Sequence, residues 1–238
     1  MRHLFLLAAL FCACISYAQI RVQERLPKSK TGFALTTAKT RAKIYYDVND
    51  ALVIKRSAEL FARDIQMVTG QKPELIQKRE RAKALVIVGT IEKNQWICEL
   101  AQKGKIDIRP LQGAWERYLI QTVDNPSPGV AKALVIAGSD RRGAAYGLFS
   151  ISEMMGVSPW YWWGDVPVKT HKALYVDAPP TYSKTPSVKY RGIFLNDEDW
   201  GLKPWAAKTF EKERGNIGPR TYAKICELLL RLKANHLA

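Results

Sequence analysis

A dense polar run lies near the end of the 238-residue chain, directly after an apolar segment. It consists of Asn196, Asp197, Glu198, Asp199 and Trp200. Barrel enzymes place their functional groups just past the carboxyl ends of buried strands. Hydrolysis of a glycosidic bond needs an acid and a base on opposite sides of that bond, and an Asn can hold a sugar hydroxyl. The run therefore indicates sugar chemistry, although the residues alone leave open an ordinary solvated acidic loop.

A glycine-bounded loop, Gly138 to Gly143, lies between an apolar run and a helical pattern. Its spacing satisfies the two glycines of a phosphate-binding loop, but Ala144 and Ala145 replace the required Lys and Ser/Thr. A nucleotide-binding function is therefore excluded. We predict that Asp140 caps the following helix. Arg141 and Arg142 are candidate ligands for a substrate carboxylate, because arginine binds carboxylates in a bidentate manner.

Four adjacent aromatic residues, Trp160 to Trp163, lie in a loop. Such rings can stack on sugars, and Trp160 is the candidate for this role. Four neighbours cannot all face one ligand, however, and tryptophans bury large areas wherever they pack. We therefore favour a hydrophobic seam between two domains, with one ring at the edge of a pocket.

The segments before these residues alternate between strand and helix patterns, which predicts an α/β domain with a small mixed sheet. Two continuous apolar runs predict strands buried on both faces. A helix that begins near Asp50 should end at Gly70, because glycine readily terminates helices. Strands are predicted at Lys43–Tyr46, Ala84–Val88, Tyr118–Val123 and Ala133–Ala137, helices at Asn94–Lys103 and Gly143–Met155, and a turn at Asn125–Gly129.

A second unit begins after Pro186. Val188 to Leu195 predicts a buried strand, and a polar loop then leads to Pro219 at the first turn of a helix. A further strand begins near Ala234. The helix carries an apolar stripe of Tyr222, Ile225, Leu229 and Leu232. A (β/α)8 barrel takes about 250 residues, so we expect residues 181–238 to hold only the first strand and helix of a truncated barrel, after an α/β accessory domain at 19–180.

The first 18 residues have the layout of a secretory signal peptide, with Arg2, an apolar run and a cleavage site after Ala18. We therefore expect a periplasmic or secreted protein that has no membrane association once the signal is removed. The net charge is +15, and the Lys and Arg residues that produce it are scattered along the chain. This distribution argues against nucleic acid as a binding partner and slightly favours an acidic carbohydrate. Cys98 and Cys226 are expected as buried or free thiols, because no metal-ligand spacing surrounds them.

Several of these motifs together resemble glycoside hydrolase family 115. They are the stretch from Tyr190 to Gly201, Asn216-Ile217-Gly218, the Gly138–Gly143 loop with Tyr146-Gly147, and Trp160 to Pro167. The resemblance implies a xylan α-1,2-glucuronidase that removes glucuronic acid or its 4-O-methyl ether with inversion. It implies the α/β domain, a (β/α)8 barrel and further C-terminal domains, with xylan or a glucuronic-acid-decorated oligosaccharide as substrate and no cofactor.

By the same resemblance, Asp197 is the expected catalytic or substrate-orienting carboxylate and Asn196 a sugar ligand. Glu198, Asp199 and Trp200 are further substrate-binding candidates. The remaining carboxylates would come from later strands, so the 238-residue chain is expected to be inactive alone, and a homodimer through C-terminal regions is left open. The alternatives are a non-catalytic carbohydrate-binding module and a hexosaminidase-like glycosidase.

Overall fold

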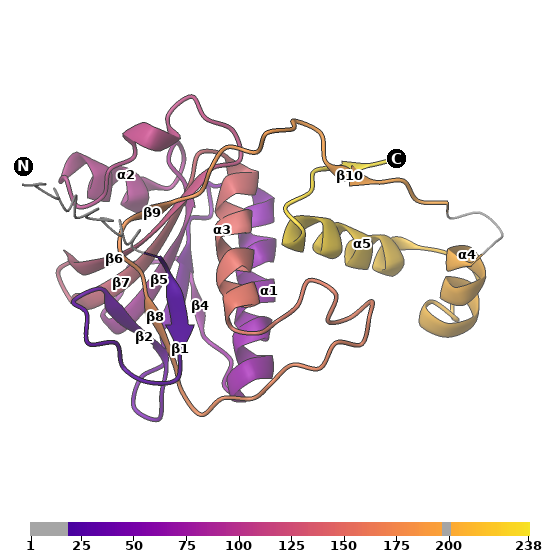
Figure 1. The fold of residues 1–238 in the computed structure, drawn as a ribbon, viewed down its shortest axis with the longest axis horizontal. Coiled ribbons are helices and arrows are strands. Elements are labelled where there is room, and N and C mark those ends of the chain that lie inside the picture. The colour runs from indigo at the N-terminus through magenta and orange to yellow at the C-terminus, as the bar shows by residue number, and fades with distance from the viewer. Residues whose placement is uncertain (1–18, 197–200) are drawn as a thin grey trace, which may run out of the picture.

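The computed structural model describes residues 19–196 and 201–238, and the predicted signal peptide lies outside them (Figure 1). The strands are β1 (Arg21–Gln23), β2 (Gly32–Thr36), β3 (Lys43–Tyr46), β4 (Leu75–Ile76), β5 (Ala82–Thr90), β6 (Tyr118–Ser127), β7 (Val130–Gly138), β8 (Leu174–Asp177), β9 (Thr181–Tyr182), β10 (Gly192–Ile193) and β11 (His236–Leu237). The helices are α1 (Leu52–Thr69), α2 (Gln95–Gln102), η1 (Arg109–Leu111), α3 (Arg141–Met154), α4 (Leu202–Trp205), η2 (Ala206–Phe210) and α5 (Pro219–Arg231).

The centre of the fold is a six-stranded sheet with the order β4-β3-β5-β7-β6-β9. β4, β3, β5 and β7 run parallel to one another, whereas β6 and β9 join in antiparallel pairs. This arrangement confirms the α/β fold with a mixed sheet that the sequence predicts.

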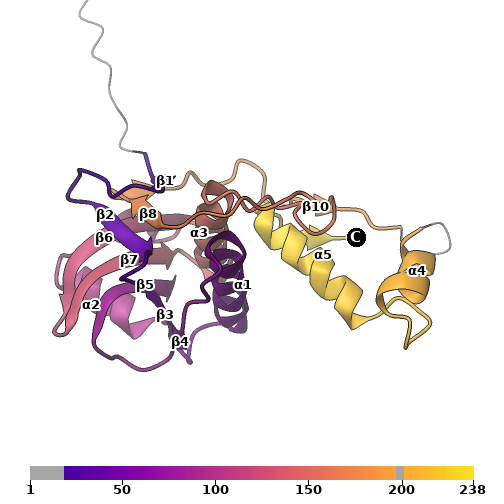
Figure 2. The same cartoon turned by 90° about the horizontal axis from the view of Figure 1, so that it is seen from below.

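Strand β5 shows why its sequence is a continuous apolar run. Val86 and Val88 pack in the core that contains α1 and α3, whereas Leu85 and Ile87 pack in the core that contains α2. Successive side chains of a strand point to opposite faces, so a sheet that has helices on both faces needs apolar residues at every position. The two views show α1 and α3 on one face and α2 on the other (Figures 1 and 2).

Helix α1 follows its predicted pattern closely. Its predicted apolar positions are all buried: Ile54, Ala58, Phe61, Ile65 and Val68. Gly70 ends the helix with φ +72°, a left-handed conformation in which glycine avoids the steric penalty of a Cβ. The predicted terminator is therefore confirmed.

The predicted turn at Asn125–Gly129 is partly wrong. β6 continues to Ser127, and only Pro128 and Gly129 form the turn to β7. The strand register shifts between Asp124 and Ser127, and Asn125 has φ +47°. A bulge of this kind absorbs extra residues within a strand, and Asn tolerates the left-handed region better than most residues.

The segment after Pro186 forms a further layer outside α1 and α3. Figures 1 and 2 both show α5 on the side of these helices away from the sheet, with α4 beyond it. The segment predicted as a polar loop contains α4 and the π-helix η2 within its described part. Of the two described cysteines, Cys98 is half-buried and Cys226 is exposed, and both are free thiols. None of the helices described here is both long and apolar enough to cross a membrane.

Candidate functional site

The candidate site lies at the carboxyl end of strand β10. β10 runs parallel to β11, with Gly192 opposite His236 and Ile193 opposite Leu237. Hydrogen bonds extend the pairing, since the Leu195 N–H donates to the Ala238 carbonyl at 2.7 Å. The carboxyl ends of parallel strands meet at one edge, which is where barrel enzymes carry their functional groups.

Asn196 is exposed directly after this pairing ends. The structure therefore places the predicted sugar ligand at the strand end. The other predicted residues of the acidic run, Asp197, Glu198, Asp199 and Trp200, lie outside the described residues.

The prediction that Val188–Leu195 forms a buried strand is wrong in extent and in burial. Only Gly192 and Ile193 form β10, and the side chain of Phe194 is 81% exposed. Ile193 and Leu195 pack against α5, whereas Phe194 belongs to the opposite face. Helix α5 covers one face of β10, and no described residue covers Phe194 on the other face.

A buried carboxylate of the α/β domain positions the two strands. Glu116 lies beneath them with a fully buried side chain and accepts from Arg191, from Asn235 Nδ2 at 2.8 Å and from Arg142 Nε at 2.6 Å. Burial alone would raise the pKa of Glu116, but hydrogen bonds from Asn235, Arg191 and Arg142 outweigh it and hold the pKa below its ordinary value. Glu116 is therefore a charged anchor for the strand pair.

Arg191 and Asn235 complete this anchor from the strand side. The Arg191 guanidinium Nε donates to the Lys233 carbonyl at 3.0 Å, just after α5. The Arg191 backbone N–H donates to Asn235 Oδ1 at 3.0 Å. Tyr146 of α3 donates its hydroxyl to the Ala234 carbonyl at 3.0 Å, and burial raises the pKa of this phenol. Together these contacts hold the starts of β10 and β11 against the α/β domain.

The two candidate substrate ligands of the Gly138–Gly143 loop, Arg141 and Arg142, do not lie together at the end of β10. Arg142 is paired with Glu116, whereas Arg141 is exposed beside a small cavity that Asp50, Glu92 and Asp140 also line. Their binding of a substrate carboxylate stays a prediction. The predicted helix cap is confirmed, since Asp140 Oδ1 accepts from the backbone N–H groups of Arg142 and Gly143 at 2.9 and 2.8 Å.

The aromatic cluster packs on the segment after Pro186. Trp162 contacts Phe210 with ring centroids 5.0 Å apart, and the Trp163 indole N–H donates to the Lys224 carbonyl at 3.2 Å. This packing agrees with the predicted seam. Trp160 is 47% exposed, and its contact with sugar stays a prediction.

A second buried ionic cluster joins α1 to α5 beside this seam. Arg231 donates to Asp64 and to Glu227, and Glu227 also accepts from Arg63 at 2.6 Å. Burial raises the pKa of Glu227, but the charges of Arg231, Arg63 and Lys224 outweigh it and lower the pKa. Burial, with Glu227 nearby, raises the pKa of Tyr161 to about 12, so the phenol stays protonated and donates to Glu227 at 3.0 Å.

Sequence reasoning missed Glu116, Asp64 and Glu227 as the carboxylates that hold this region. Each lies far along the chain from at least one of its partners, so no local spacing marks it. Within the described ranges, no group of His, Cys, Asp and Glu side chains is arranged to hold a metal ion.

Two comparisons bear on this geometry. Residues 183–238, which include β10, α5 and β11, match the sequence profile of glycosyl hydrolase family 115. A solved structure of a family GH115 4-O-methyl-α-glucuronidase with specificity for decorated arabinogalactans is 36% identical, with a TM-score of 0.71 over 86% of this chain. The predicted family is confirmed: the chain belongs with glycoside hydrolase family 115.

The family 115 chain described here spans 25% of the length of that glucuronidase. It is also similar to a product-bound variant of Streptomyces plicatus β-hexosaminidase, at 12% identity and a TM-score of 0.45, over 92% of this chain and 32% of that one. A β-N-acetylhexosaminidase from Streptomyces coelicolor gives 13% identity and a TM-score of 0.42 over the same shares. No curated protein matches the chain significantly.

Proposed function

We propose that the whole protein is a glycoside hydrolase that releases α-linked glucuronic acid, or its 4-O-methyl ether, from a decorated polysaccharide. The observation that carries the proposal is the position of Asn196, next to Asp197, at the carboxyl end of β10 within the family 115 match. The 36% identical glucuronidase supports the same linkage.

In this proposal Asp197 acts as a catalytic or substrate-orienting carboxylate, and Asn196 holds a sugar hydroxyl. An inverting mechanism needs a second carboxyl group about 6.5–9.5 Å away, with room for one water between the two. The buried carboxylates of Glu116, Asp64 and Glu227 are engaged by arginines, so they are unsuited to this role. We infer that the 238-residue chain alone does not turn over substrate.

The carrier polysaccharide is a glucuronoxylan or an acidic arabinogalactan. Xylan follows from the family resemblance, and arabinogalactan follows from the specificity of the 36% identical enzyme. Incubation of the full-length protein with each polymer separates them, since uronic acid should be released from only the preferred carrier. No release from either polymer would sink the proposal.

The residue assignment is tested by Asp197→Asn in the full-length protein. Loss of acid–base catalysis costs about 10²–10⁴-fold in rate, so kcat should fall by that factor while the unfolding midpoint stays unchanged. Glu74→Gln, which changes an exposed carboxylate of the α/β domain outside the candidate site, is the matched control and should retain activity. NMR of the first product should show the β-anomer, and an α-anomer would contradict inversion.

We also propose export with cleavage after Ala18, on the basis of the apolar run behind Arg2. The N-terminal residue of protein recovered from the periplasm or medium should be Gln19. Recovery of the protein in the cytoplasm with an intact Met1 would contradict export.

A further inference from the structure

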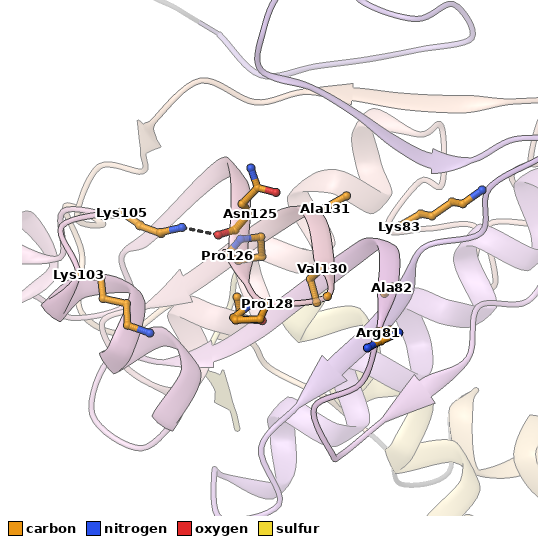
Figure 3. Close-up of a pocket in the computed structure, with 12 residues that line it drawn as sticks. Arg81, Ala82, Lys83, Lys103, Lys105, Asn125, Pro126, Pro128, Val130 and Ala131 are labelled. Atoms are coloured by element: carbon orange, nitrogen blue, oxygen red, sulfur yellow. Dashed lines mark hydrogen bonds between the residues drawn. The ribbon is translucent and has the colours of Figure 1, made fainter.

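A groove of about 730 Å³ lies at one end of the strands of the six-stranded sheet (Figure 3). The start of β5, the end of α2 and the turn between β6 and β7 form its walls. β5 begins at this groove with Ala82 and ends at Thr90. At about 3.3 Å per residue, the groove is therefore roughly 26 Å from the opposite end of the strand. Glu116 and Arg142 meet at that opposite end, where β7 ends at Gly138.

The lining of the groove is strongly cationic. Four basic side chains contribute to it, Arg81, Lys83, Lys103 and Lys105, and no acidic residue is among its described lining residues. Neither Arg81 nor Lys83 makes an ion pair with another described residue. Lys103 Nζ is 3.9 Å from Glu99, whose carboxylate already accepts two hydrogen bonds from Arg79. The positive charge of the groove is therefore largely uncompensated.

Figure 3 shows the β6–β7 turn between the lysines that follow α2 and Arg81. Pro126, Pro128 and Val130 make this part of the lining apolar. Gly129 allows the arrangement, since a Cβ there would lie 2.9 Å from Arg81 Cγ, and its φ of +84° favours glycine. Arg81 thus lies across the turn, next to an apolar strip.

We propose that this groove binds the uronic-acid-decorated polysaccharide itself, as a second contact separate from the strand end. The inference rests on the proposed function for the identity of the polymer. Carboxylates along a sugar chain would pair with the four cations, and the apolar faces of the sugar rings would cover the proline strip. Single-stranded nucleic acid fits less well, because its binding sites stack bases on aromatic rings, and no described lining residue is aromatic. A polymer held at the groove would have a higher effective concentration at the strand end, because the second contact becomes intramolecular.

Affinity electrophoresis of the 238-residue chain in glucuronoxylan tests the proposal. The chain should be retarded at low salt, and carboxyl-reduced glucuronoxylan, which keeps the backbone but lacks the charge, should not retard it. Arg81→Glu with Lys103→Glu should weaken binding about tenfold or more, because two attractive ionic contacts become repulsive. Lys39→Glu with Lys72→Glu makes the same charge change on exposed lysines outside the groove and should leave retardation intact.

Equal retardation of the groove variant and the wild type would overturn the proposal. An equal loss in the control variant would also overturn it, because diffuse charge would then account for binding. Tighter binding of a single-stranded oligothymidylate would point instead to nucleic acid. Because electrophoresis needs no turnover, absence of uronic acid release by the full-length protein would defeat only the proposed function. Conversely, a groove variant of the full-length protein with an unchanged KM on the polymer would defeat only the groove.

Discussion

Arg231 donates a parallel pair of hydrogen bonds to Asp64, at 2.8 and 2.7 Å, across the contact between α5 and α1. The two side chains are 2% and 0% exposed. Planar guanidinium and carboxylate groups match in this geometry, which gives direction as well as attraction. The contact fixes how α5, and with it the end of β10, lies against the α/β domain.

Arg231→Met should destabilise the protein by about 3–5 kcal/mol, because it leaves the buried Asp64 charge without its partner. The double variant Asp64→Leu/Arg231→Met should recover most of that loss, since it removes both charges. Urea unfolding measures each free energy. Arg56→Met, which breaks an exposed pair with Glu59, is the control and should cost less than about 1 kcal/mol. A cost for Arg231→Met as small as this would contradict the buried pair.

Glu116 should make stability depend on pH. Its folded-state pKa is below the ordinary 4.5, because hydrogen bonds from Asn235, Arg191 and Arg142 outweigh the effect of burial. As pH falls, the unfolded chain takes up the proton first, so the stabilisation present at neutral pH declines below about 4.5 and is lost below the folded-state pKa. Unfolding free energies of the wild type and Glu116→Gln, measured from pH 7 to pH 3, should therefore converge. A constant difference across that range would refute the role of the charge.

Gly192→Ala should disturb the pairing of β10 with β11. A Cβ at this position would lie 2.0 Å from the His236 carbonyl oxygen, so the two backbones would have to move apart. Overpacking of this kind costs about 1–3 kcal/mol. Hydrogen exchange at the Leu195 N–H, which is bonded across the strands, should accelerate. Gly201→Ala, where a Cβ meets nothing within 4 Å, should leave that exchange unchanged.

The aromatic seam predicts that Trp163 and Trp160 contribute differently to the free energy of unfolding. Trp163→Ala removes a ring that packs on Trp162 and Trp205, so it should lower the free energy of unfolding by about 1–3 kcal/mol. Trp160→Ala changes a half-exposed ring and should leave stability within about 0.5 kcal/mol. If Trp160 stacks on sugar, its loss should weaken binding to glucuronoxylan in affinity electrophoresis. Equal destabilisation by the two substitutions would contradict the seam.

The α/β domain was predictable because its signals are local. The pattern that buries Ile54, Phe61 and Ile65 repeats at the spacing of a helix, and Gly70 follows at its end. Asp140 caps α3 through hydrogen bonds two and three residues away, which is within reach of a sequence motif. The bulge at Asn125 escaped prediction because its residues are also typical of turns.

The anchor of the candidate site was not predictable in the same way. Glu116 and Arg191 are 75 residues apart, and nothing near Glu116 in sequence distinguishes it from a surface carboxylate. The sequence marks Arg142 only as a candidate substrate ligand, and nothing local indicates its ion pair with Glu116, which lies 26 residues away. The exposure of Phe194 depends on which layers cover β10, which the apolar run Ile193–Leu195 does not specify.

The acidic and basic partners of the two buried ionic clusters, Asp64 with Arg231 and Glu116 with Arg191, are synthesised at different times. A ribosome makes Asp64 and Glu116 well before Arg231 and Arg191, and domains generally fold as units with the N-terminal one first. The nascent α/β domain therefore presents its acceptor carboxylates, beside the side chains of Tyr146 and Phe149, while the arginines that cover them are still to be translated. The later segment therefore docks onto a face of the α/β domain that is made first, so formation of the two ionic clusters has to wait for the end of synthesis.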